Sequence, residues 1–191
     1  MKHILGILGG MGPQASIRFY NLIIEISINT YGIRKNADFP HLLINSIPVS
    51  DLVKSESRKR ETITTVAKEA RRLARAGATA LVMPCNTMHL FLKDIQKNMA
   101  VPLFSMVEAV VEKVKKDGIK RIGLLGSKTT IGSGLYTNIL EKKGITVLIP
   151  KESDQDRVAS LIHKVIAGDA SKREANSLRK ILKILKKAGA Q

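Results

Sequence analysis

Cys85 is the only cysteine in this sequence of 191 residues and has the clearest capacity for chemistry. It lies in the segment Met83–His89, directly after the apolar run 78–83, which predicts a short buried strand. Open α/β sheets bind ligands at the carboxyl ends of their strands. A helix that follows would also bring its N-terminus near the thiol and stabilise a thiolate. A buried structural cysteine is the alternative, because free cysteine is among the most buried residue types.

The residues after Cys85 could assist such a thiol. Asn86 and Thr87 can offer an amide, a hydroxyl and backbone donors to an oxyanion. His89 follows Cys85 by four residues, which is one turn of a helix, so it could polarise the site or lie on a helix surface. A hydrolase would use Cys85 as a nucleophile, yet no residue identifies the base and the orienting group that this chemistry needs.

Two further loops could bind anions. The turn 9–13 (Gly-Gly-Met-Gly-Pro) follows an apolar run and opens a helix, so its N–H groups could hold a carboxylate or phosphate. It lacks the G-x-G-x-x-G spacing of a dinucleotide site, and a turn without ligand is the alternative. Thr129 and Thr130 follow a similar strand and could bind a carboxylate or cap the next helix.

The composition argues against a metal site, an intrachain disulfide and a membrane span. The four histidines show no metal-ligand spacing, so we expect no metal. A single cysteine excludes an intrachain disulfide, and the simplest location is the cytoplasm. No apolar stretch approaches the roughly 18 residues of a membrane span, so no membrane partner is expected.

The formal net charge of +16 favours anionic partners at the encounter stage. Its basic residues are scattered over the polar sides of amphipathic segments, and aromatic residues make up 4% of the chain. A stacking platform for bases is therefore not expected, and neither is a nucleic-acid partner. We interpret the charge as a solvated surface.

Strand and helix patterns alternate, which predicts an α/β fold with parallel sheets flanked by helices. The expected strands are 4–8, 41–47, 78–83, 102–105, 120–127 and 145–149. The expected helices are 14–29, 62–76, a segment through Phe91 and Ile95, 106–116, 130–143, 154–167 and 172–187.

The pattern restarts near residue 120, which predicts two pseudo-symmetric lobes, residues 1–117 and 118–191. Arg75-Ala76-Gly77-Ala78-Thr79 leads into the Cys85 strand, and a similar stretch around Gly189 closes the sequence. Cys85 lies eight residues beyond Gly77, so the matching position in the second lobe would be 197. The second lobe is accordingly expected to be truncated.

The segments 6–13, 83–89 and 123–126, in this order, resemble the aspartate/glutamate racemase family, and most closely its aspartate racemase branch. The resemblance runs the length of the chain. It implies two lobes with the active site in the cleft between them, a small-molecule amino-acid substrate, no pyridoxal phosphate or other cofactor, no metal, and a homodimer. It also implies two cysteines, one from each lobe, that transfer protons on opposite faces of the substrate α-carbon.

By this resemblance Cys85 is the catalytic acid/base of the first lobe. Asn86 and Thr87 would bind the α-carboxylate, while the turn with Met11 and Gly12 would line the same cleft. The second lobe would contribute Thr129 and Thr130.

The sequence departs from the family pattern in three places. The second cysteine is absent. A Pro-Asp-Arg stretch found in members is matched here by Ser50-Asp51-Leu52, and a basic residue expected near 154–157 corresponds to Arg157, one position displaced. These departures leave two alternatives open: a decarboxylase or one-base exchange enzyme that uses a single cysteine, and a ligand-binding protein without activity.

Overall fold

Strands and helices alternate along the chain, as the sequence predicts. The computed structural model describes residues 3–49 and 56–191, and the stretch Ser50-Asp51-Leu52 lies outside the described residues. The strands are β1 (Ile4–Gly9), β2 (His41–Ser46), β3 (Ala80–Val82), β4 (Arg121–Gly123) and β5 (Thr146–Leu148). The helices are α1 (Pro13–Asn29), α2 (Glu56–Arg75), α3 (Leu92–Gln96), α4 (Met106–Lys116), α5 (Lys128–Gly132), α6 (Thr137–Lys142), α7 (Glu152–Ala167) and α8 (Lys172–Lys187), with short 3₁₀ segments at Asn36–Asp38 and Thr87–Phe91.

The chain divides into two compact units, Met1–Met106 and Val107–Gln191. Residues 107–117 are expected in the first lobe from the sequence, whereas in the structure they belong to the second unit. This is because Val107 and Val111 of α4 belong to the same buried cluster as Tyr136 and Leu140.

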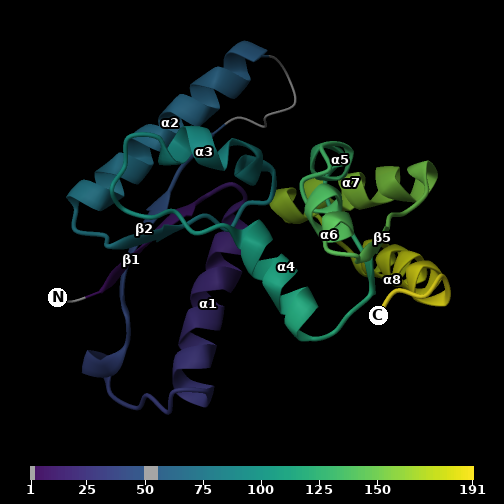
Figure 1. The fold of residues 1–191 in the computed structure, drawn as a ribbon, viewed down its shortest axis with the longest axis horizontal. Helices are drawn as coiled ribbons and strands as arrows, with labels where there is room; N and C mark the ends of the chain where they lie inside the picture. Colours follow the sequence, from purple (N-terminus) through teal and green to yellow (C-terminus); the bar gives the residue numbers. More distant parts are fainter. Residues whose placement is uncertain (1–2, 50–55) are drawn as a thin grey trace. The chain divides into compact units, whose positions relative to one another are not determined.

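The first unit is built on a parallel sheet with strand order β2-β1-β3. Figure 1 shows α1 and α2 on opposite sides of β1 and β2. The core lies between the sheet and α2, where Val66 and Ala70 pack with Leu8 and Leu81. Because β1 is the central strand, its residues from Gly6 to Gly9 are all buried, as expected for a parallel strand between neighbours.

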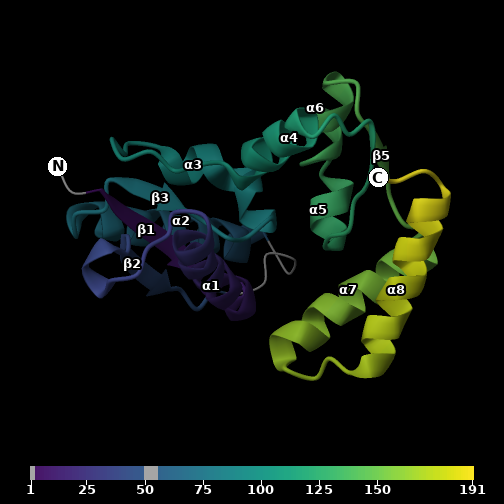
Figure 2. The same ribbon diagram turned by 90° about the horizontal axis from the view of Figure 1, so that it is seen from below.

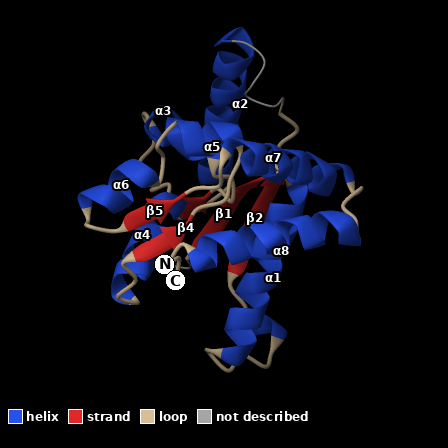
Figure 3. Cartoon of the chain, turned by 90° about the vertical axis from the view of Figure 1, so that its right-hand side faces the viewer, coloured by secondary structure: helices blue, strands red, loops and turns tan. Residues whose placement is uncertain are grey.

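The second unit contains two parallel strands, β4 and β5, drawn in red in Figure 3. Leu140 and Ile145 form part of one buried cluster, and Val158, Ile181 and Leu185 form another between α7 and α8. Figure 2 shows these two helices side by side. Their packing closes one face of the β4–β5 pair, because Leu125 and Leu148 contact the same cluster.

Several expected elements differ in extent from the observed ones. The single helix expected over 130–143 is wrong: α5 and α6 are separate, since Gly134 between them has a positive φ of 69°, which ends a helix. The strand expected over 102–105 is reduced to one bridge between Leu103 and Leu81. The helix expected from residue 62 begins at Glu56.

The expected internal repeat is visible in hydrogen bonds as well as in sequence. In the first unit the N–H of Thr79 donates to the carbonyl oxygen of Ile4 over 2.8 Å. In the second unit the N–H of Gln191 donates to the carbonyl oxygen of Arg121 over 2.9 Å. Each donor lies two residues beyond a glycine of positive φ that ends a long helix. The two units therefore connect helix to sheet in the same way.

The α/β class with parallel sheets flanked by helices is confirmed. Truncation of the second lobe stays a prediction. Within residues 3–49 and 56–191, none of the helices combines the length and the apolar character that crossing a bilayer requires.

Candidate active site

The loops after β1 and β3 meet at the same edge of the first sheet. Ile7 pairs with Val82 in the parallel register, so Gly10 and Cys85 each lie three residues beyond that pair. Met11 and Cys85 also pack against the same buried cluster. The structure thus brings together two site segments that the sequence predicted separately, at the carboxyl edge where such sheets bind ligands.

The Cys85 thiol is partly buried just beyond the end of β3. Burial raises the pKa of the Cys85 thiol, while the backbone N–H groups of Met88 and Thr87 lower it by a smaller amount. The expected helix N-terminus is present as a short 3₁₀ segment, but the expected thiolate stabilisation is outweighed by desolvation. In this structure Cys85 is therefore a protonated thiol at neutral pH.

Asn86 and Thr87 follow the cysteine at the start of the 3₁₀ segment. Asn86 is exposed and Thr87 is half-buried, and the carbonyl oxygen of Asn86 accepts the N–H of His89 over 3.0 Å. Their side chains lie next to the thiol in sequence, as the expected carboxylate contact requires. Their role toward a substrate stays a prediction.

The interpretation of His89 as a helix-surface residue is wrong, and its polarising role at the site stays a prediction. His89 is buried, so it does not lie on a helix surface. Its Nδ1 lies 2.7 Å from the carbonyl oxygen of Cys85, and its Nε2 lies 3.0 Å from the backbone nitrogen of Met106. Because both ring nitrogens are engaged with the backbone, the imidazole is not directed at the thiol.

The glycine turn is held by the Ser16 side chain, which no sequence motif marks. The N–H of Gly10 donates to Ser16 Oγ over 3.0 Å, so this N–H is already used within the protein. Gly10 has a φ of 90°, and a Cβ atom there would lie 2.5 Å from the nitrogen of Ile47. Glycine at this position is therefore required by the close approach of two strand ends, whether or not an anion binds nearby.

Thr129 and Thr130 lie within α5 in the second unit. The cap of this helix is Ser127, whose Oγ accepts the N–H of Thr130 over 3.1 Å, so the capping alternative for the two threonines is wrong. Thr130 is buried, and its Oγ1 lies 3.0 Å from Ser127 Oγ. The polar position directly before a helix was the signal for Ser127 in the sequence.

A second residue that sequence reasoning missed supports this loop. Gln155, buried in the first turns of α7, donates from Nε2 to the carbonyl oxygen of Gly126 over 2.8 Å. Two residues on, Arg157 Nη1 donates to the buried carboxylate of Asp154 over 2.9 Å. Arg157, the displaced basic residue, is thus engaged by a neighbour on its own helix. No periodicity or motif marked Gln155 in advance.

Over the two ranges that the structure describes, no three His, Cys, Asp or Glu side chains are grouped as a metal ion would need. The polar groups next to the Cys85 thiol are the backbone N–H groups of Met88 and Thr87. Backbone N–H groups of this kind can hold a negatively charged group near a thiol.

Several known proteins are similar to this chain in sequence and in fold. The family model described as Asp/Glu/Hydantoin racemase matches residues 8–191. The broad specificity amino-acid racemase RacX of Bacillus subtilis is 30% identical over 159 residues, which are 83% of this chain and 69% of that protein.

Solved structures agree with the sequence comparisons. An aspartate racemase homologue from Pyrococcus horikoshii has a TM-score of 0.78 and 30% identity, covering 100% of this chain and 82% of that chain. The aspartate racemase of Picrophilus torridus has a TM-score of 0.81 and 25% identity, covering 97% and 77%. The match of sequence over most of the chain and of fold over nearly all of it leads to one conclusion: the chain belongs to the Asp/Glu/hydantoin racemase family.

Proposed function

We propose that this chain is a cofactor-independent amino-acid racemase, acting on aspartate or glutamate, in which Cys85 transfers a proton at the substrate α-carbon. The observation that carries the proposal is the position of the thiol: it lies at the carboxyl end of the sheet, next to the N–H groups of Thr87 and Met88. Membership of the racemase family supports the reaction class.

The chemistry requires a base and an acid on opposite faces of the α-carbon. When the α C–H bond breaks, its electron pair stays on carbon and the proton passes to the base. A thiol then gives its proton to the other face, which inverts the stereocentre. Because burial raises the pKa of the Cys85 thiol, Cys85 is suited to be the donor in the resting protein. The opposing group must then be the base for that direction.

One observation favours a second candidate. Cys85 is the only cysteine in the sequence, so a second thiol is not available from these 191 residues. A protein with one acid/base would exchange the α-proton with solvent and return it to the same face. We therefore keep one-base exchange as the alternative function.

The proposed substrate contacts are the residues that the resemblance implies. They are Met11, Gly12, Asn86 and Thr87 in the first unit, and Thr129 and Thr130 in the second. The net charge of +16 supports an acidic amino acid, because a positive field raises the encounter rate with anions. The half-buried position of Thr87 beside the thiol fits a contact to the α-carboxylate.

The chain is further proposed to act in the cytoplasm as a homodimer. On α1, Ile17 is 61% exposed and Tyr20 is 41% exposed, and Tyr31 beyond its end is 75% exposed. Ile17 and Tyr20 are three residues apart and so lie on one face of the helix, and exposed apolar side chains on one face are typical of surfaces covered by another protein. Sedimentation of the protein at several concentrations checks the dimer, and a monomer at all concentrations contradicts it.

The reaction is tested by incubating each enantiomer of aspartate and glutamate with the full chain in D₂O. Loss of the α-proton is followed by NMR, and inversion by chiral chromatography. Racemisation appears as both exchange and inversion, whereas one-base chemistry gives exchange with retention. If neither enantiomer of either amino acid exchanges its α-proton, the proposed function is wrong.

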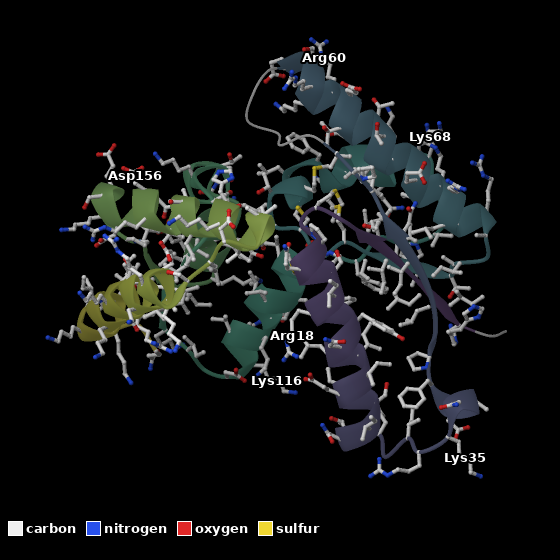
Figure 4. The ribbon with its side chains drawn as sticks, turned by 180° about the vertical axis from the view of Figure 1, so that it is seen from behind. Arg18, Lys35, Arg60, Lys68, Lys116 and Asp156 are labelled. Carbon is white, nitrogen blue, oxygen red and sulfur yellow. The ribbon has the colours of Figure 1, made fainter. Side chains whose placement is uncertain are left out.

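Cys85→Ser is the decisive variant, since general acid–base groups contribute about 10²- to 10⁴-fold to a rate. We expect a loss in that range for α-proton exchange. Arg60→Gln is the matched control, because Arg60 is an exposed side chain that points away from α2 in Figure 4. A Cys85→Ser variant with wild-type exchange would remove Cys85 from the mechanism.

A further inference from the structure

His89 connects two loops of the first unit through its ring. Its Nδ1 faces the carbonyl oxygen of Cys85 at 2.7 Å, and its Nε2 faces the backbone N–H of Met106 at 3.0 Å. Only 6% of the residue is exposed. A buried imidazole with both nitrogens on backbone atoms is held in one orientation.

The chemistry of the two partners fixes the tautomer. A carbonyl oxygen can only accept a hydrogen bond, so Nδ1 must carry the hydrogen; a backbone N–H can only donate, so Nε2 must offer its lone pair. The ring is therefore neutral. Burial lowers the pKa of His89, and the smaller opposite effects of the Cys85 and Phe104 backbone groups do not reverse this, which agrees with a neutral ring at pH 7.

The two loops joined by the ring follow neighbouring segments of the sheet. Leu81 in β3 donates to the carbonyl oxygen of Pro102 over 2.8 Å and accepts the N–H of Phe104 over 2.9 Å. The chain then turns into α4, whose first residue is Met106. The first N–H groups of a helix have no partner within the helix, so His89 supplies the acceptor for one of them.

We propose that His89 is a positioning residue for Cys85. Its Nδ1–H donates a hydrogen bond to the Cys85 carbonyl oxygen, and its Nε2 accepts one from the first residue of α4, so the ring ties the cysteine peptide to the start of that helix. The proposal rests on the proposed function, because it concerns how the thiol is presented to a substrate. Fixing the carbonyl fixes the peptide that carries the thiol and keeps the thiol close to the N–H groups that follow. A displacement of the order of 1 Å at a reacting group can cost about 10²-fold in rate.

Two substitutions separate the two halves of this contact. The amide nitrogen of His89→Asn can take the place of Nδ1 and still donate to Cys85. The amide oxygen of His89→Gln reaches the place of Nε2 and can still accept from Met106. The pair differs in which backbone group is kept, and both variants are neutral and polar.

The readout is the alkylation rate of Cys85 by iodoacetamide in the full chain at pH 7 and over a pH series. Cys85 is the only cysteine, so every modified thiol reports on this site. When the Cys85 carbonyl is released, water reaches the thiol and the thiolate fraction rises. A decrease of one unit in pKa would raise that fraction about tenfold. We therefore expect His89→Gln to alkylate on the order of tenfold faster than wild type, and His89→Asn less than about threefold faster.

A ratio between the two variants of at least about threefold supports the proposal, with that threshold set by a shift of half a pKa unit. A smaller ratio overturns it, whether both variants resemble the wild type or both are equally reactive, because the Cys85-facing bond would then not control the thiol. In the D₂O assay, the rate of α-proton exchange should fall further in His89→Gln than in His89→Asn. If the wild type exchanges no α-proton but alkylation still separates the variants, the proposed function fails and the positioning role stands.

If either variant does not fold, the wild-type protein decides. Nitrogen-15 NMR of the ring must show a neutral imidazole protonated at Nδ1 at pH 7, and the Met106 amide must exchange slowly with D₂O. A ring protonated at Nε2, or a Met106 amide that exchanges as fast as an exposed one, overturns the proposal.

Discussion

Substitution of Gly10 by alanine should destabilise the first unit more than the same substitution at Gly32. Both glycines have positive φ, 90° at Gly10 and 68° at Gly32. A Cβ atom at Gly10 would lie 2.5 Å from the nitrogen and 2.7 Å from the oxygen of Ile47, whereas at Gly32 no atom lies within 4 Å. The pair therefore separates the cost of the backbone conformation from the cost of the close approach.

The magnitude follows from the contacts that must break. A left-handed conformation costs a residue with a Cβ roughly 1–2 kcal/mol, and this applies to both variants. At Gly10 the backbone must also move away from Ile47, which breaks the bond from the Ile47 N–H to the Gly9 oxygen, 3.0 Å long. The 3.0 Å bond from the Gly10 N–H to Ser16 Oγ lies on the same turn. At about 1 kcal/mol for each bond, Gly10→Ala should lose about 2 kcal/mol more than Gly32→Ala.

The measurement is urea unfolding of both variants, followed by circular dichroism. A difference of about 2 kcal/mol corresponds to roughly a thirtyfold change in the folding equilibrium. The slopes with urea must agree among the proteins for the comparison to hold. If Gly10→Ala is no less stable than Gly32→Ala, the close approach of the turn to Ile47 does not exist in solution.

Three further predictions concern single side chains. Burial raises the pKa of Cys85 above its unfolded value, so the protonated thiol contributes stability below the unfolded pKa, and this stability is lost as pH rises through the folded pKa. Burial also raises the pKa of Tyr136, so both proteins should lose stability in alkali. Melting temperatures should fall more in wild type than in Cys85→Ser, and equal losses would contradict the prediction. The hydrogen bond from Lys164 lowers the pKa of Glu174 to about 2, so its stabilising effect should persist above the unfolded pKa and disappear as pH falls through about 2. In an NMR titration Lys164→Met should raise that pKa, and an unchanged value refutes the pairing. Leu140 is fully buried and Leu182 is 46% exposed, so urea unfolding should show a loss of about 2–5 kcal/mol for Leu140→Ala and below about 1 kcal/mol for Leu182→Ala; similar losses would show that Leu140 is not in a packed core.

Elements with strong local signals were predicted closely from the sequence. The helices at 106–116 and 172–187 have the expected bounds, because each combines an apolar stripe with clear end signals. Ser171 and Glu174 form a capping box at the start of the second one. The position of Cys85 just beyond a buried strand is also confirmed.

Elements whose ends depend on exposed residues or on single backbone angles were not predicted. The first turns of α2 are highly charged and mostly exposed, so they carry no apolar period that could mark its start at Glu56. The apolar pattern over 130–143 continues across Gly134, and only the positive φ of that residue separates α5 from α6.

The candidate site was predicted in its positions more than in its chemistry. The sequence motifs located Cys85 and the glycine turn. The two segments lie at the same sheet edge because β1 and β3 pair in a parallel register. Desolvation of the thiol and the two backbone partners of His89 arise from tertiary packing, which no local pattern records. Ser127 accepts the N–H of Thr130, and Gln155, from a helix distant in sequence, holds the carbonyl oxygen of Gly126 in the loop before α5.

The exposed apolar side chains of α1 have a consequence for how molecules of this protein behave in concentrated solution. Ile17 and Tyr20 offer apolar surface to a neighbouring molecule. Mutual repulsion from a net charge of +16 opposes such contacts, and salt screens that repulsion over about 10 Å at 0.1 M. Association of chains through this helix should therefore strengthen as salt is added.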